Sequence, residues 1–402
     1  MGSCEIQRGE GCAASPAEAI AAVGRHCAPV GMEEVPLAAA CGRVLAQDVV
    51  ADRASPAADV SAMDGFAVRS SEAARGELPL MGEARAGRAP GELATGHAMA
   101  ISTGAVIPAG ADAVVKKEEA TVRDGRLACR GGVAPGQNIR RAGENGGAGA
   151  KVGEAGVVVS PALAGAMASF GLRRVRVHRR VRVGVVVTGD ELTAGAGALP
   201  AWQLRDSNGP ALAAMMGSAA WVESKRCPRS ADDPDATRRA IDEAGRDVDL
   251  LLVTGGVSMG DHDHVPGALG ALGANVVFHR VTQRPGRPVL GAVLASGVPV
   301  LGLPGNPVSV MVTARQMARP VAARLAGVRG DEPVTAVRVE GHDKTLDLWW
   351  HRLVRLMPGG VARVADGRGS GDVVAAATAD AFVEIPPGLA GAGPWALFKW
   401  EW

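Results

Sequence analysis

The chain has 402 residues, of which 47% are hydrophobic and 21% charged, and its formal net charge is +1. This length predicts two to four domains, and the near-zero net charge offers no basic field for binding nucleic acid. The six cysteines form no C-x-x-C pair and no secretory leader is visible, so we expect a cytoplasmic protein without a zinc or disulfide framework.

The first predicted domain is helical and discontinuous, made of residues 14–51 and 150–180. Ser15 can cap a helix from Pro16 to Cys27, and Ser160-Pro161 begins a second helix that Gly171 can end. We expect these two helices to pack on each other. The uncharged stretch around the second helix is interrupted by Pro161 and Gly171, which favours a short buried helix over a membrane span.

The other domains follow in chain order. Residues 52–149 alternate short apolar runs with Gly, Pro and Asn, which predicts a β-rich domain. Residues 181–328 alternate continuous apolar strands with helices, which predicts a parallel α/β sheet covered on both faces. Residues 329–402 return to period-2 alternation and predict a C-terminal β domain. The fold class is therefore multidomain α/β plus β.

Three loops of the α/β domain follow strand ends, where open parallel sheets bind ligands. They carry Gly189-Asp190-Glu191, the segment from Gly255 to His264, and Pro304-Gly305-Asn306-Pro307. Glycine permits close approach of the backbone to a ligand, and a helix N-terminus attracts an anion. Because Glu191, Asp261 and Asp263 would repel a bare phosphate, the pattern indicates a phosphate site that also holds a divalent cation.

Several alternatives are weaker. The sequence has no G-x-x-x-x-G-K-[ST] P-loop and no G-x-G-x-x-G between a strand and a helix, which disfavours a P-loop ATPase or a nicotinamide dehydrogenase. His262 and His264 could join a metal cluster, but an oxygen-rich magnesium site would not recruit them. In the β-rich domain, Asp64, Thr103 and Arg140 lie in turn-rich segments, and turn chemistry alone could explain them.

Eight motifs together carry a resemblance that no single one would. The motifs are SAMDGFAVR, STGAVIPAGADAVV, GQNIRRAGE, VVTGDEL, DSN, TGGVSMGDHD, RPGRP and GLPGNPVS. Their order and spacing are similar to those of the molybdopterin molybdenumtransferases. This is the MoeA family, which includes the E-domain of gephyrin. The resemblance runs from about Pro16 to Gly371.

The resemblance implies four domains, with a MogA-like α/β domain third and a β-barrel-like domain last. It implies a homodimer whose cleft lies between the third domain of one subunit and the second domain of the other. The implied reaction inserts molybdenum from molybdate into adenylylated molybdopterin and releases AMP and molybdenum cofactor, with Mg²⁺ required. The implied partners are a MogA-like adenylyltransferase upstream and molybdoenzymes or their chaperones downstream, with neither nucleic acid nor membrane involved.

The resemblance also implies roles for individual residues. Glu191 and Asp263 match positions that organise metal and phosphate, and they are expected to act catalytically together with Asp64, Thr103, Arg280 and Arg284. The expected substrate-binding residues are Arg140, Asp190, Asp232, Gly255, Gly256, Ser258, Pro304, Gly305, Asn306, Pro307, Arg352 and Ser370. Asp232 could instead be part of a helix cap.

The chain also departs from the family pattern. Asn145 stands where an aspartate is usual, Phe66 replaces a tyrosine, and Arg280 and Arg284 fall where lysines are usual. Arginine is not a neutral replacement for lysine, because its planar fork binds anions bidentately. These departures suggest a divergent paralogue and leave a second hypothesis open, a non-catalytic carrier of the cofactor that docks on a molybdoenzyme.

Overall fold

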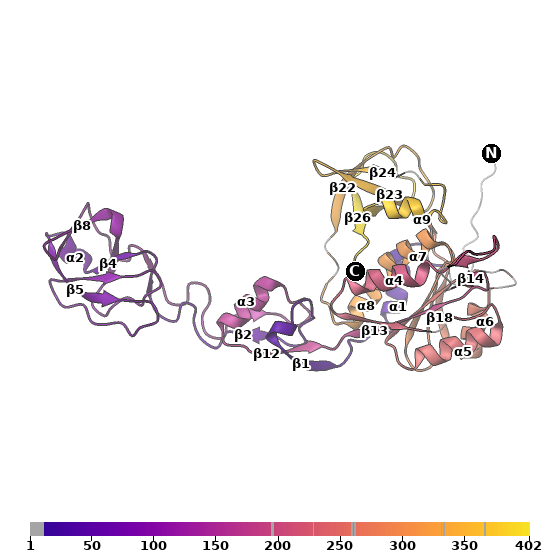
Figure 1. Ribbon diagram of the computed structural model, residues 1–402, viewed down its shortest axis with the longest axis horizontal. Helices are drawn as coiled ribbons and strands as arrows, with labels where there is room; N and C mark the ends of the chain where they lie inside the picture. The colour runs from indigo at the N-terminus through magenta and orange to yellow at the C-terminus, as the bar shows by residue number, and fades with distance from the viewer. Residues whose placement is uncertain are drawn as a thin grey trace. The chain divides into compact units, whose positions relative to one another are not determined.

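A computed structural model describes residues 12–193, 197–227, 229–258, 260, 263–330, 332, 334–365 and 367–402. The chain divides into two compact units (Figure 1). The larger unit holds the described residues up to Gln47, residues 155–161, and the chain from Arg174 onward. The smaller unit holds Asp48–Glu154 and Ala162–Arg173.

A six-stranded sheet of order β16–β13–β17–β21–β20–β18 forms the centre of the larger unit. Its strands are β16 (Val222–Arg226), β13 (Val181–Val187), β17 (Leu250–Thr254), β21 (Pro299–Leu303), β20 (Leu290–Val293) and β18 (Asn275–His279). The first four are parallel, as predicted. Strand β20 runs antiparallel to both of its neighbours, β21 and β18, which corrects the all-parallel expectation. The reason lies in the short turn between β20 and β21, closed by Leu294 N–H to the Val298 carbonyl, since a parallel pair would need a long crossover.

Helices cover both faces of this sheet (Figure 1). One face carries α1 (Pro16–Gly24), α4 (Asn208–Gly217), α7 (Pro307–Thr313), a π-helical turn η3 (Ala314–Ala318) and α8 (Arg319–Leu325). The other carries α5 (Pro234–Gly245) and α6 (Val265–Ala271). Alternate residues of β13 serve the two cores, because successive side chains of a strand point to opposite faces: Val185 joins the first cluster and Val186 the second.

The predicted helix caps are present. Ser15 Oγ accepts from the Glu18 N–H at 3.2 Å, and the Asp233 carboxylate accepts from the Ala236 N–H at 2.8 Å. The expected packing of the first helix is wrong, however. The buried side chains of α1, Ala19 and Val23 among them, belong to the core of the α/β sheet, whereas nearly all of α3 (Pro161–Ser169) belongs to the smaller unit. Helix α3 also buries only Met167, so it is not the buried helix expected.

The C-terminal strands close into a barrel. Strands β23 (Trp349–Met357), β24 (Val361–Val364), β22 (Thr335–Glu340), β26 (Trp395–Lys399) and β25 (Ala381–Ile385) pair in that order, and β25 pairs back with β23. Strand β19 (Gln283–Arg284) extends this sheet by pairing in parallel with β23. Remaining elements of the larger unit are β1 (Met32–Pro36), η1 (Leu37–Ala39), β12 (Arg174–His178), β14 (Leu192–Thr193), β15 (Leu204–Arg205) and α9 (Val373–Thr378).

The smaller unit is built on a six-stranded sheet of its own, as the β-rich pattern predicted. Its order is β7 (Ala113–Lys116), β4 (Gly65–Val68), β6 (Ala98–Ile101), β5 (Leu78–Ala84), β9 (Arg126–Cys129) and β8 (Ala120–Arg123). Shorter elements complete it: β2 (Val49–Val50), β3 (Val60–Ser61), α2 (Ser70–Ala73), η2 (Lys117–Glu119), β10 (Ile139–Arg140) and β11 (Lys151–Gly153). Across the residues that the structure describes, no helix has both the length and the apolar character to cross a bilayer.

Candidate active site

Three loops meet at one edge of the α/β sheet because three parallel strands end there in register. Val187 of β13 lies beside Thr254 of β17, which in turn lies beside Leu303 of β21. The loops that follow enclose a cleft of about 430 Å³. Of the residues predicted from the sequence, this cleft is lined by Glu191, Asp232, Gly255, Gly256, Ser258, Asp263, Pro304, Gly305, Asn306 and Pro307.

Glycine is required where these loops touch. Gly255 adopts φ +86°, and a Cβ there would lie 2.6 Å from Thr188 Oγ1 and 3.2 Å from the Thr188 carbonyl oxygen. Across the cleft, the Gly305 carbonyl accepts from Asn208 Nδ2 at 2.8 Å, which ties the β21 loop to the start of α4. The result is a floor of exposed backbone that a flat or anionic group can approach closely.

Carboxylates surround this floor. Asp190 and Asp232 form two reciprocal hydrogen bonds, in which the backbone N–H of each donates to the side chain of the other at 3.1 Å. Asp232 therefore organises the loop, whereas Asp233 caps α5. Asp263 Oδ2 accepts from the Gly260 N–H at 2.7 Å. Glu191 lines the cleft from the β13 loop.

The donor chemistry fits magnesium, although the residues that the structure describes form no complete cage. Within the described ranges no three His, Cys, Asp or Glu side chains converge as a metal-binding group; Asp261 and His262 lie outside those ranges. Mg²⁺ is usually held by one or two carboxylates together with substrate phosphates and water. Glu191 and Asp263 supply such carboxylates at the cleft.

A second cavity, of about 640 Å³, adjoins the cleft on the barrel side and shares Pro288, Pro304 and Asn306 with it. Of the site residues predicted from the sequence, Arg284, Arg352 and Ser370 also line this second cavity. Asn306 Nδ2 donates to Ser370 Oγ at 3.0 Å, which joins the α/β loop to the barrel.

The barrel side of this cavity is cationic. The guanidinium of Arg352 lies 4.6 Å from the centre of the Trp350 ring, a cation–π contact that orients its fork. Arg284, which pairs with Trp350 through β19, and Arg287, in the loop that follows β19, also line this cavity. Arg280 lines neither cavity; it has φ +77° and its backbone carbonyl accepts from the Ala13 N–H. Its catalytic role therefore stays a prediction.

The predicted residues of the smaller unit form two local clusters. Asp64 Oδ1 accepts from the Thr103 N–H at 2.7 Å and from Thr103 Oγ1 at 2.9 Å, and these two donors lower the pKa of Asp64. Arg140 pairs with Glu144 and donates to Asn145 Oδ1 at 3.0 Å. The first cluster fixes a carboxylate in its ionised form, and the second holds an arginine.

Sequence reasoning overlooked part of this region. Asp206 and Asn208 line the cleft, but the DSN motif that contains them does not by itself predict a binding role. Trp350 and His351 line the barrel-side cavity and were not predicted as site residues. An aspartate followed by a helix usually indicates a cap, which is also what Asp206 provides at α4 by accepting from the Gly209 N–H at 2.9 Å. The signal was present, but a cap and a lining residue look the same in a sequence.

Comparison with known proteins agrees with this architecture. Residues 14–171 match the MoeA N-terminal region (domain I and II), and residues 184–324 match a probable molybdopterin binding domain. A molybdopterin molybdenumtransferase of Synechococcus elongatus is 37% identical over 305 residues, which cover 73% of this chain and 75% of that protein. The chain belongs to the MoeA family.

Other relatives extend the likeness. A molybdopterin molybdenumtransferase of Staphylococcus aureus is 32% identical over 372 residues, covering 89% of this chain and 88% of that one. Among solved structures, the MoeA protein of Pyrococcus horikoshii superposes with a TM-score of 0.82 at 26% identity, covering 96% of this chain and all of that one. The resemblance inferred from the eight motifs is thereby confirmed, and so is the multidomain fold.

Proposed function

We propose that this MoeA-family chain inserts molybdenum from molybdate into adenylylated molybdopterin and releases AMP and molybdenum cofactor. The observation that carries the proposal is a glycine-floored cleft lined by Glu191 and Asp263, adjoining a cavity that presents Arg284 and Arg352. Phosphate and molybdate oxygens need cationic partners, and a phosphate placed among carboxylates needs a divalent cation.

The reaction balances without any electron transfer. Water cleaves the bond between the adenylyl phosphorus and the bridging oxygen, so AMP leaves with the new oxygen and the pterin keeps its phosphate. Both dithiolene sulfurs then bond to molybdenum, and one molybdate oxygen leaves as water with the two thiol protons. Such chemistry asks the protein mainly to position charges.

The chain's own residues would divide this work. Gly255 and Gly256 let the backbone approach the phosphates, and Arg284 and Arg352 would hold oxyanion charge on the barrel side. Glu191 and Asp263 would hold Mg²⁺, which when bound would offset phosphate charge. The Asp64 carboxylate, kept ionised by Thr103, would act near the molybdate.

The direct test is molybdate-dependent AMP release from adenylylated molybdopterin by the purified protein. We expect turnover that requires Mg²⁺ and falls at least a hundredfold in Glu191→Gln. Tight substrate binding without turnover, at any level of Mg²⁺ or molybdate, would instead support the carrier hypothesis. One observation favours that alternative: Asn145 is neutral where an aspartate is usual, and it is occupied in holding Arg140.

We also propose that the working form is a cytoplasmic homodimer in which Asp64 of one subunit serves the cleft of the other. Co-expression of Asp64→Ala and Glu191→Ala subunits tests this directly. Random pairing makes half of the dimers mixed, each with one intact cleft if the clefts are shared, so activity should return to about a quarter of wild type. No recovery, with mixed dimers present, would mean that each cleft is built within one subunit.

The proposed place in the cell follows from the substrates. An adenylyltransferase of the MogA type must supply the adenylylated pterin, and molybdoenzymes or their chaperones must take the product. Neither nucleic acid nor a membrane enters this proposal.

A further inference from the structure

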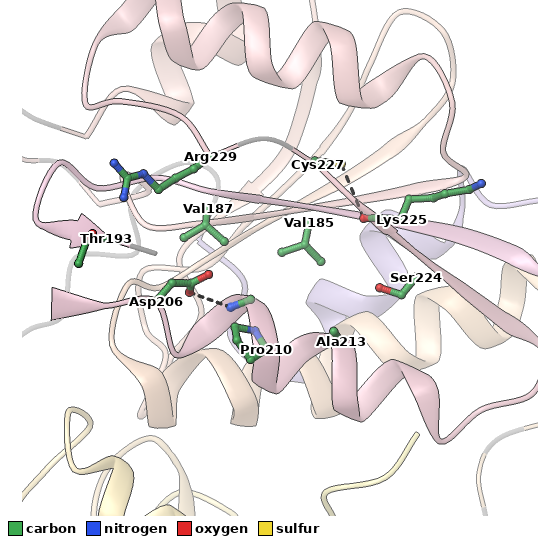
Figure 2. A pocket seen from close by; sticks show the side chains of 11 residues that line it. Val185, Val187, Thr193, Asp206, Pro210, Ala213, Ser224, Lys225, Cys227 and Arg229 are labelled. Carbon is green, nitrogen blue, oxygen red and sulfur yellow. Dashed lines mark hydrogen bonds between the residues drawn. The ribbon is translucent and has the colours of Figure 1, made fainter. Parts of the chain in front are cut away.

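A third hollow, here called the lateral pocket, lies between α4 and the outer strands β13 and β16 (Figure 2). Its volume is about 470 Å³. It is lined by Val185, Val187, Thr193, Asp206, Gly209, Pro210, Ala213, Ser224, Lys225, Cys227 and Arg229. Val187 ends β13 and Cys227 directly follows β16, so this pocket reaches the same sheet edge as the cleft.

Asp206 connects the lateral pocket to the cleft, since it lines both. Its Oδ1 accepts from the Gly209 N–H, while Oδ2 has no hydrogen-bond partner among the residues that the structure describes. A Cβ at position 209 would lie 2.6 Å from that Oδ2, so glycine is what allows the carboxylate to lie against the start of α4. The free oxygen is an acceptor for an N–H donor on a bound molecule.

The walls of the lateral pocket are mostly apolar. Val185 and Val187 form the floor, and Pro210 and Ala213 of α4 face them (Figure 2). Burial raises the pKa of the Cys227 thiol, so this side chain stays uncharged at neutral pH. A largely apolar slot with a few placed polar groups is the usual form of a site for a flat heterocycle.

Two cations also line the lateral pocket, and each has a partner on the protein. Lys225 forms an ion pair with Glu223, and Arg229 donates to the Leu192 carbonyl.

We propose that the lateral pocket binds a flat, aminated heterocycle of the substrate, with Asp206 accepting from its amino or ring N–H group. This proposal rests on the proposed function, because adenylylated molybdopterin carries two such rings, the purine and the pterin. The Asp206 carboxylate favours an N–H donor over a phosphate at its end of the pocket, and a purely aliphatic group would leave that acceptor unused.

The test uses the full-length protein and two probes, AMP for the purine and 6-hydroxymethylpterin for the pterin, titrated by calorimetry. Ala213→Leu adds bulk inside the pocket without altering charge, at an exposed position of α4 that tolerates it. Ala214→Leu is the matched control, since Ala214 is the next exposed residue of α4 and does not line the pocket. Unfolding temperatures establish that both variants fold.

We expect Ala213→Leu to weaken binding of one probe at least tenfold, while Ala214→Leu binds as wild type does. Loss of AMP alone assigns the purine to the pocket, and loss of the pterin alone assigns the pterin. The assignment is overturned if neither probe binds the wild type, if Ala213→Leu binds both normally, or if both variants weaken binding equally.

A second variant covers the case in which Ala213→Leu does not fold. Asp206→Asn keeps an acceptor for Gly209 but replaces the free oxygen with an N–H₂ donor, so the same tenfold loss is expected, and normal binding overturns the assignment. Absence of AMP release by the wild type would defeat the proposed function alone, because probe binding that depends on Ala213 would still establish the pocket.

Discussion

Gly255→Ala offers the sharpest test of how the cleft is built. Gly255 adopts φ +86°, and the left-handed region costs an L-residue about 1–2 kcal/mol. The added Cβ would also lie 2.6 Å from Thr188 Oγ1 and 3.2 Å from the Thr188 carbonyl, so the β17 and β13 loops must move apart. We expect the free energy of unfolding to fall by about 2–5 kcal/mol, which is the backbone cost plus an overpacking cost of about 1–3 kcal/mol.

The assay is urea denaturation followed by fluorescence and far-UV circular dichroism. Thr188→Ala in the same background separates the two contributions, because it removes the hydroxyl but leaves the carbonyl and the backbone strain. It also loses the hydrogen bond from Thr188 Oγ1 to the Thr254 carbonyl, worth about 1 kcal/mol. Gly255→Ala should therefore cost less in the Thr188→Ala protein than in wild type.

Gly305→Ala is the control for this prediction. Gly305 has no positive φ, and its added Cβ would lie 3.7 Å from Gly255 Cα, an ordinary contact. We expect its effect on stability to stay under about 1 kcal/mol. If Gly255→Ala were as stable as wild type, the close approach of the two loops, and with it the glycine floor, would be refuted.

Three further predictions concern the other parts of the chain. Thr103→Val should raise the pKa of Asp64 toward its ordinary value without restoring it fully, because the backbone N–H of residue 103 still donates. NMR titration of the carboxyl group measures this pKa, and an unchanged value would contradict the prediction. Since the folded pKa is lowered, the stabilisation is present above the unfolded pKa and is lost as pH falls through the folded one. Phe382→Ala should lower the free energy of unfolding by about 3–5 kcal/mol, because the ring is fully buried against α7 and α9. Differential scanning calorimetry would show a lowered Tm, and an unshifted Tm would refute this packing. Trp350→Leu should raise the KM for molybdate several-fold with little change in kcat, because Arg352 loses the ring that orients it. Trp350→Phe keeps an aromatic ring and should retain most of the affinity. Equal kinetics for wild type and Trp350→Leu would argue against that orientation.

The sequence by itself determined the features that depend on neighbours a few residues away. The caps at Ser15 and Asp233 were predictable because a cap requires only a side-chain acceptor two or three residues before an N–H group. The apolar strands were predictable from composition, and the site loops followed because parallel strands end at one edge. Nine of the ten predicted cleft residues lie in these loops, whereas Asp232 was predicted only from the resemblance to the family.

The tertiary structure alone decided the features that join distant segments. Three features depend on pairings that no local period encodes: the core that takes up α1, the closure of the barrel by β25 on β23, and the reversed direction of β20. Asp206 is the clearest case: its hydrogen bond to Gly209 is local, but the cavity that its second oxygen faces is formed by β13, β16 and α4 together.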